Sequence, residues 1–190
     1  MRTHLLTLSA AVLLTASSVQ AEQPADPNAG EAKALIKEFA TTLQGELQGA
    51  MKAGGPTEAI AVCKERAPAI AADLSARSGW EVGRTSLKVR NQALNLPDDW
   101  ETGVLEAFEE RKAAGEPVDT MAFAEVVEVD GAKQFRFMKA IPTGQVCLAC
   151  HGTQITPEVK AALDEQYPGD QARGYSLGDI RGAFSLSKPL

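Results

Sequence analysis

Histidine is almost absent from this chain. Its 190 residues contain two histidines, His4 and His151, and only three cysteines. A zinc site needs about four Cys or His ligands, usually as two closely spaced pairs, and a haem peroxidase needs a distal acid/base group, usually a second histidine. Aromatic residues make up 5% of the sequence, so any cofactor pocket should have mainly aliphatic walls. The composition therefore disfavours zinc binding and peroxidase activity.

The chain also lacks a surplus of positive charge and a run long enough to span a membrane. Its formal net charge of −6 disfavours nucleic acid and anionic lipid as partners. The apolar run over residues 5–14 is too short for a bilayer and fits a signal peptide, with Arg2 before it and a Val19-x-Ala21 cleavage pattern after it. Cleavage after Ala21 would remove one positive charge and change −6 to −7. We expect an exported, periplasmic protein without membrane insertion; the rival interpretation keeps residues 1–21 as an uncleaved anchor.

Against this background one motif stands out, Cys147-x-x-Cys150-His151. It is the attachment signature of a c-type haem, in which two thiols add to the porphyrin vinyl groups and the adjacent imidazole becomes an axial iron ligand. The sequence thus predicts one covalent haem c, attached through Cys147 and Cys150, with His151 on the iron. A zinc site, a thioredoxin-like dithiol and a structural disulfide remain as alternatives. The first lacks a second ligand pair, and the second lacks a βαβ setting.

The residue on the other side of the iron can be narrowed by elimination. After signal cleavage His151 would be the single histidine left, so a second histidine ligand from the same chain is excluded. Cys63 is the odd cysteine, and a thiolate binds ferric iron well, but a small buried residue on an alanine-rich helix is an equally good interpretation. The candidates are Met51, Met121, Met138, Cys63, a lysine, water or no ligand.

The hydrophobic pattern indicates an α+β domain with N-terminal helices and one antiparallel sheet. Residues 22–29 are expected to be a flexible leader and residues 30–190 the domain. Gly54-Gly55-Pro56 should end the first helix, Pro68 should kink or divide the second, and Asp130-Gly131 should form a hairpin. The expected helices are 30–53, 56–78, 100–114 and 156–165, and the expected strands are 80–89, 121–128, 133–140 and 182–187.

Several blocks of sequence match a known family across residues 30–188. They are Ala61–Lys64, Ala67–Ala71, Gly83–Asn91, Pro97–Glu101, Phe137–Ile141, Cys147–Gly152, Tyr167–Asp170 and Gly174–Ser185. On these blocks the chain resembles exported single-haem c-type proteins with a PAS-like domain, which stand alone or form the sensory part of membrane histidine kinases. One departure is visible, because the family usually reads Arg-Asn-Pro-Ala-Asn where this chain has Arg90-Asn91-Gln92-Ala93-Leu94-Asn95.

The resemblance implies a PAS-like sheet flanked by helices, with His151 and a helix cysteine, which matches Cys63, as axial ligands. Thiolate ligation would stabilise ferric iron and lower the reduction potential. Arg90 and Arg181 are candidates for pairing with the haem propionates, since guanidinium groups match carboxylates, although each also fits an ordinary surface arginine. We therefore expect a non-catalytic module for redox or small-ligand sensing that acts on an unknown redox or signalling protein. The alternatives are an electron-transfer cytochrome and, less favoured, a peroxidase-type enzyme or a dithiol oxidoreductase.

Overall fold

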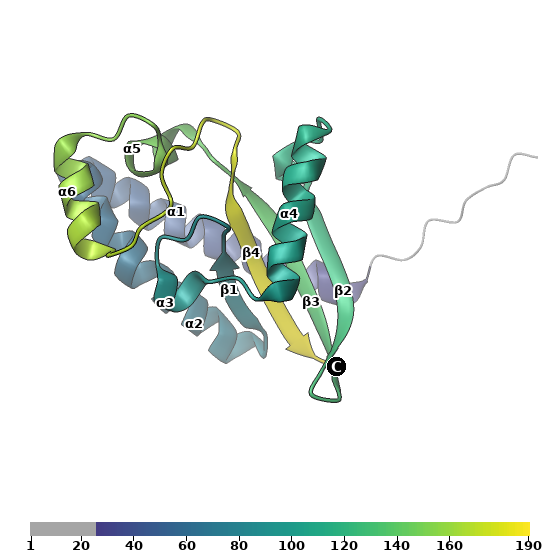
Figure 1. The fold of residues 1–190 in the computed structure, drawn as a ribbon. Helices are drawn as coiled ribbons and strands as arrows, with labels where there is room; N and C mark the ends of the chain where they lie inside the picture. Colours follow the sequence, from purple (N-terminus) through teal and green to yellow (C-terminus); the bar gives the residue numbers. More distant parts are fainter. Residues whose placement is uncertain (1–25) are drawn as a thin grey trace, which may run out of the picture.

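A computed structural model describes residues 26–190 (Figure 1). The proposed signal peptide and residues 22–25 of the proposed leader lie outside this range. The helices are α1 (Pro27–Ala61), α2 (Ala67–Ser78), α3 (Gln92–Asn95), α4 (Asp99–Ala113), α5 (Leu148–His151) and α6 (Pro157–Gln166), with a π-helical turn (Val62–Arg66) between α1 and α2. The strands are β1 (Glu81–Thr85), β2 (Ala122–Val129), β3 (Ala132–Pro142) and β4 (Ile180–Pro189).

The four strands form one antiparallel sheet in the order β1-β4-β3-β2. Helix α4 crosses one face of the sheet, and the long helix α1 lies behind the opposite face (Figure 1). The β2–β3 hairpin turns at Asp130 and Gly131, whose φ angles of 51° and 78° suit a tight two-residue loop. The predicted α+β class, with an antiparallel sheet and flanking helices, is confirmed.

Strand β3 shows how the sheet builds two separate cores. Its side chains alternate between the faces, as in any strand. Phe135 and Phe137 pack with α1 and α2, whereas Met138 and Ala140 pack with the apolar side of α4. A third, smaller cluster joins α6 to the end of α1 through Ile60 and the α6 side chains. The core on the α1 side is the one that borders the candidate site.

The N-terminal helices differ from the prediction in two details. Helix α1 begins at Pro27, so the last three residues of the expected flexible leader are helical. The expected break is confirmed at Gly55, whose φ of 73° and ψ of −162° are not helical. Pro68 does not kink a helix but lies in the first turn of α2, where its missing N–H is not needed. The division occurs before it, in the π-helical turn.

The segment after β1 is also less extended than the sequence predicted. The expected strand over residues 80–89 ends at Thr85, because the Ser86 hydroxyl then accepts from Lys88 N (3.2 Å) and donates to Arg181 O (2.9 Å). The single turn of α3 occupies the stretch where the chain departs from the family pattern. Within residues 26–190, no helix is both long and apolar enough to cross a membrane.

Candidate cofactor site

A cavity of about 640 Å³ lies between α1 and the sheet, at the end where β1, β3 and β4 meet the Cys-x-x-Cys-His segment. This volume is typical of pockets that hold organic cofactors. The aliphatic side chains of α1, including Ile36, Leu43 and Leu47, form much of its apolar wall. All six residues singled out in the sequence line it, namely Cys63, Arg90, Cys147, Cys150, His151 and Arg181.

The motif itself forms one compact turn. Cys147 ends a short 3-10 turn and Leu148–His151 form a single helical turn, so both thiols reach the same cavity. Gly152 then lets the chain turn away, because a Cβ at this position would lie only 2.6 Å from the Leu148 carbonyl oxygen. The three cysteines of the chain are free and half-buried. The local geometry thus presents two thiols and one imidazole from five consecutive residues.

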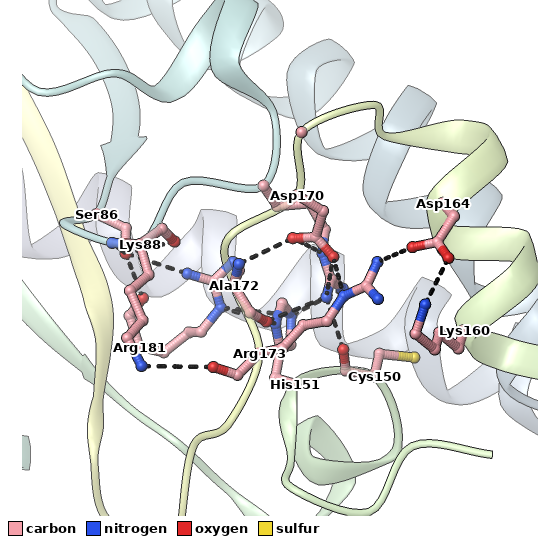
Figure 2. Close-up of polar contacts among 12 residues, drawn as sticks. Ser86, Lys88, Cys150, His151, Lys160, Asp164, Asp170, Ala172, Arg173 and Arg181 are labelled. Atoms are coloured by element: carbon pink, nitrogen blue, oxygen red, sulfur yellow. Dashed lines mark hydrogen bonds and ion pairs between the residues drawn. The ribbon is translucent and has the colours of Figure 1, made fainter. Parts of the chain in front are cut away.

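His151 is held in one orientation by the segment that precedes β4. Its Nδ1 lies 2.7 Å from the Ala172 carbonyl oxygen, which can only accept, so the hydrogen is on Nδ1 and the lone pair is on Nε2. Arg90 Nη1 and Arg181 Nε each lie 3.4 Å from Nε2. The Tyr175 amide donates to the His151 carbonyl at 2.9 Å. Figure 2 shows His151 beside Ala172 and Arg181. Burial, and then the cations Arg181 and Arg90, keep the pKa of His151 well below its ordinary value, so the imidazole stays neutral, as a metal ligand must.

Arg90 ties this segment to the motif. Its Nη2 donates to the Cys150 carbonyl at 2.6 Å and to the Ala172 carbonyl at 3.1 Å, and its Nε donates to Asp170 Oδ1 at 3.1 Å. The side chains of Arg90 and Asp170 are 7% and 1% exposed. Burial alone would raise the pKa of Asp170, but hydrogen bonds from Arg90 and Arg173 outweigh it and hold this pKa low. Arg90 therefore organises the backbone around His151, and its contact with a propionate stays a prediction.

Arg181 reaches the cavity because β4 contains a bulge. The pairing runs Ile141 with Gly182 and then Pro142 with Ile180, which leaves Arg181 without a partner residue. Such a bulge re-aims a side chain. It depends on Gly182, since a Cβ there would lie 2.3 Å from the Thr85 carbonyl oxygen. The Arg181 guanidinium then donates to the Ser86 hydroxyl at 3.3 Å, and its Nε lies 3.1 Å from Nδ1 and 3.4 Å from Nε2 of His151.

Cys63 enters the cavity from the π-helical turn between α1 and α2. Such turns are rare and often occur at functional sites. Burial raises the pKa of the Cys63 thiol, and the nearby cations Arg84, Arg90 and Arg181 partly offset this rise. The thiol is therefore neutral until an additional positive centre approaches it.

The structure also removes two of the other candidates for the second iron ligand. Met121 and Met138 are fully buried in the core on the α4 side of the sheet, away from the cavity. Met51 lines the cavity, which its position on an apolar helix face did not reveal. Of the side chains weighed in the sequence, Cys63, Met51 and the lysines of the cavity wall remain.

The cavity wall is strongly basic although the chain is acidic. Six basic residues and one acid line it, against a net charge of −6 for the whole sequence. The six are Lys33, Lys37, Arg84, Arg90, Lys139 and Arg181, and the acid is Asp119. A pocket with apolar walls, an excess of cations, two thiols and an imidazole lone pair fits an anionic porphyrin such as haem.

Two residues of this site were missed in the sequence. Arg84 lies on β1 two positions after Val82, so strand alternation could have placed it on the α1 face with that core residue. Tyr167 lines the cavity from the end of α6, and burial raises its pKa to about 12. No local pattern marks Tyr167, because its position depends on how α6 packs against α1.

A bare metal ion does not fit the same residues. Within residues 26–190, no three His, Cys, Asp or Glu side chains come close enough together to hold an ion. A structural zinc site would need four such ligands. A porphyrin provides four nitrogen ligands itself and requires only one or two from the protein, which is the number that His151 and one opposite side chain can supply.

Comparisons with known proteins agree with this fold. Residues 8–189 match the Tll0287-like family. The structure is similar to the crystal structure of the cyanobacterial heme-protein Tll0287, with a TM-score of 0.66 and 21% sequence identity, over 87% of this chain and 97% of that chain. At this identity the similarity establishes the fold. No curated protein sequence is significantly similar to this chain.

Proposed function

The chain belongs to the Tll0287-like family, and from this premise we propose that it is a haem-binding protein that carries one covalent haem c on Cys147 and Cys150. The observation that supports this most directly is the cavity, which collects both thiols and the Nε2 lone pair of His151 on one short turn. The structurally similar Tll0287 is a heme-protein. Covalent attachment follows from the Cys-x-x-Cys-His spacing.

His151 and Cys63 are the proposed axial ligands. The Ala172 carbonyl fixes the tautomer of His151, a role that backbone oxygens commonly have beside metal-bound imidazoles. Cys63 enters the same cavity from a different part of the chain. When bound, the haem supplies a one-electron iron centre with an axial position that can exchange.

A non-catalytic sensing role, for redox state or a small ligand, fits the properties of Cys63. Burial favours the neutral thiol of Cys63. In a haem-loaded protein, Cys63 would bind ferric iron as a thiolate, and an electron from a redox partner together with a proton from solvent would return it to the thiol. Such a change would be passed to a redox or signalling protein. We place this activity in the periplasm, because residues 1–21 have the pattern of a signal peptide.

The experiment that tests the ligand assignment compares three holoproteins produced with haem-maturation machinery: wild type, Cys63→Ala and Met51→Ala. A pyridine haemochrome spectrum first verifies covalent haem in each. Electron paramagnetic resonance should then show a thiolate-type low-spin ferric signal in wild type and Met51→Ala, and a different signal in Cys63→Ala. Identical signals from wild type and Cys63→Ala would remove Cys63 as a ligand, and absence of haem from wild type would overturn the function.

The sensing role has its own test, made on the same wild-type sample. Reduction, followed by exposure to carbon monoxide or nitric oxide, should change the bands of the absorption spectrum that report axial ligation. If reduction leaves the ligation unchanged and neither gas binds, the protein is an electron carrier and the sensing proposal is wrong.

A further inference from the structure

Three arginines face the cavity, and they differ in their partners. Arg90 is paired with the buried carboxylate of Asp170 and donates to two backbone carbonyls. Arg84 and Arg181 form no ion pair with any carboxylate among residues 26–190. Both side chains are half-buried and line the cavity, and a cation that faces an apolar-walled pocket without an anion is favourably placed for a ligand that supplies the opposite charge. The two unpaired arginines therefore need an explanation that the fold itself does not give.

The Arg84 side chain points from β1 toward α1. Its guanidinium carbon lies 5.2 Å above the centre of the Phe39 ring, and no hydrogen bond from the guanidinium to residues 26–190 is present. Burial lowers its pKa, although arginine remains charged at any physiological pH. The donors that Arg84 leaves open lie in the wall of the cavity.

Arg181 has two side-chain acceptors, the Ser86 hydroxyl and His151, but in a haem-loaded protein His151 would no longer be one of them. The Nε of Arg181 lies 3.1 Å from Nδ1 and 3.4 Å from Nε2 of His151. Because Nδ1 already donates its hydrogen to the Ala172 carbonyl, Nε2 is the ring nitrogen that can accept. When that nitrogen becomes an iron ligand it no longer accepts, and only the Ser86 hydroxyl remains as an acceptor for the Arg181 side chain. Axial ligation by His151 thus frees a guanidinium that faces the cavity.

We infer that Arg84 and Arg181, from the neighbouring strands β1 and β4, bind the two propionate carboxylates of the haem, whereas Arg90 is a positioning residue for His151. This inference rests on the proposed function. Guanidinium forks bind carboxylates through two parallel hydrogen bonds. The remaining cations of the wall, Lys33, Lys37 and Lys139, are point charges that are more strongly hydrated, and the first two are exposed at the rim.

Arg84 gives the cleaner test, because it has no contact with the proposed ligand His151. The variants are Arg84→Gln, Arg84→Lys and Arg181→Gln, with Arg77→Gln as the control, since Arg77 pairs with Glu38 and Asp73 on the exposed side of the helices. Each is isolated as the holoprotein. The readouts are the propionate bending band in the resonance Raman spectrum and the reduction potential of the haem.

We expect a shifted propionate band and a lower potential in Arg84→Gln and Arg181→Gln, because a cation beside the haem favours the added electron. Arg84→Lys should restore most of the potential but not the band, since lysine keeps the charge and loses the fork. Arg77→Gln should match wild type. All variants should keep covalent haem, because the thioether bonds do not involve arginine.

The outcomes separate this inference from the proposed function. Wild type without a haemochrome spectrum would overturn the function. Covalent haem in every variant, together with a propionate band and potential in Arg84→Gln equal to those of wild type, would overturn the inference alone. If Arg84→Gln does not fold, Arg84→Lys tests the inference instead. An unshifted propionate band in that variant would show that the Arg84 guanidinium does not bind a propionate.

Discussion

The two sides of the cavity are built differently. On the His151 side, hydrogen bonds hold the motif from several directions: the Ala172 carbonyl, the Tyr175 amide and the buried pair of Arg90 with Asp170. On the Cys63 side the wall is a helix with an irregular turn, and its nearest charged tethers, such as Arg66 with Glu46, lie at the surface. One side is fixed by a buried polar network, and the other is held by apolar packing.

This difference indicates what each side can do. A buried, fully paired polar network has a single favourable arrangement, so His151 should keep its orientation through a change of ligand or charge. A helical turn held by apolar contacts can shift without breaking buried hydrogen bonds. The asymmetry favours a permanent ligand on one side of the haem and a releasable one on the other.

The largest expected effect on stability comes from disrupting the buried polar network on the His151 side of the cavity. Asp170→Asn leaves Arg90 as an unpaired buried cation, and removal of one partner of such a pair costs about 3 kcal/mol. We expect a loss of that order in the free energy of unfolding of the holoprotein, measured with urea, and a changed His151 environment by electron paramagnetic resonance.

Asp164→Asn is the matched control, because Asp164 also pairs with Arg173 but is half exposed. Its effect should be much smaller than that of Asp170→Asn. Equal losses in the two variants would contradict the distinction between the buried network and surface pairing.

The second effect concerns the bulge that presents Arg181. Gly182→Ala would place a Cβ 2.3 Å from the Thr85 carbonyl oxygen and force the strands apart. Strain of this kind costs roughly 2 kcal/mol. We expect that loss in urea unfolding of the holoprotein, with a shift in haem potential as Arg181 moves.

Gly83→Ala, in the neighbouring strand, controls for replacing a strand glycine. Its Cβ would lie 3.8 Å from the Ser185 carbonyl oxygen, which is ordinary contact. If both variants unfold at the same urea concentration as wild type, the bulge does not depend on Gly182.

Lowering the pH should gradually reduce the contribution of the buried Arg90–Asp170 pair to the free energy of unfolding. Because the pKa of Asp170 is lowered in the folded protein, its contribution is complete above the unfolded value of about 3.9 and is lost as the pH falls through the folded value. Urea unfolding at a series of pH values should therefore show a steeper acid loss for wild type than for Asp170→Asn. Parallel curves for the two proteins would show that Asp170 does not contribute to the acid response.

The smallest effect is expected on the Cys63 side. Arg66→Ala removes an exposed ion pair with Glu46, and pairs of this kind contribute little. We expect an unchanged urea midpoint and an unchanged low-spin signal. A change in the haem spectrum would mean that this surface pair holds the π-helical turn in place.

Local features of the sequence predicted much of this architecture. The motif at Cys147–His151, the hairpin at Asp130 and the break at Gly55 depend on residues adjacent in the chain, so their chemistry is visible in the sequence. Arg90 pairs with Asp170, which lies 80 positions further along the chain. The bulge at Arg181 lies between the pairs Ile141–Gly182 and Pro142–Ile180, whose members are 41 and 38 positions apart. Pairing at such distances leaves no periodic pattern. The role of Arg84 was missed for another reason: strand alternation with Val82 places it on the α1 face, but the sequence does not show that it lacks a carboxylate partner there.

The π-helical turn that contains Cys63 bears on how such a site can evolve. Its backbone bonds span one residue more than those of an α-helix, so it corresponds to a single inserted amino acid. Each residue of an α-helix advances the side chains by about 100°. Deleting one residue from this turn would restore a regular helix and rotate the preceding side chains relative to α2 by that angle. A one-codon change could therefore remove the thiol from the cavity without altering any amino acid that lines it.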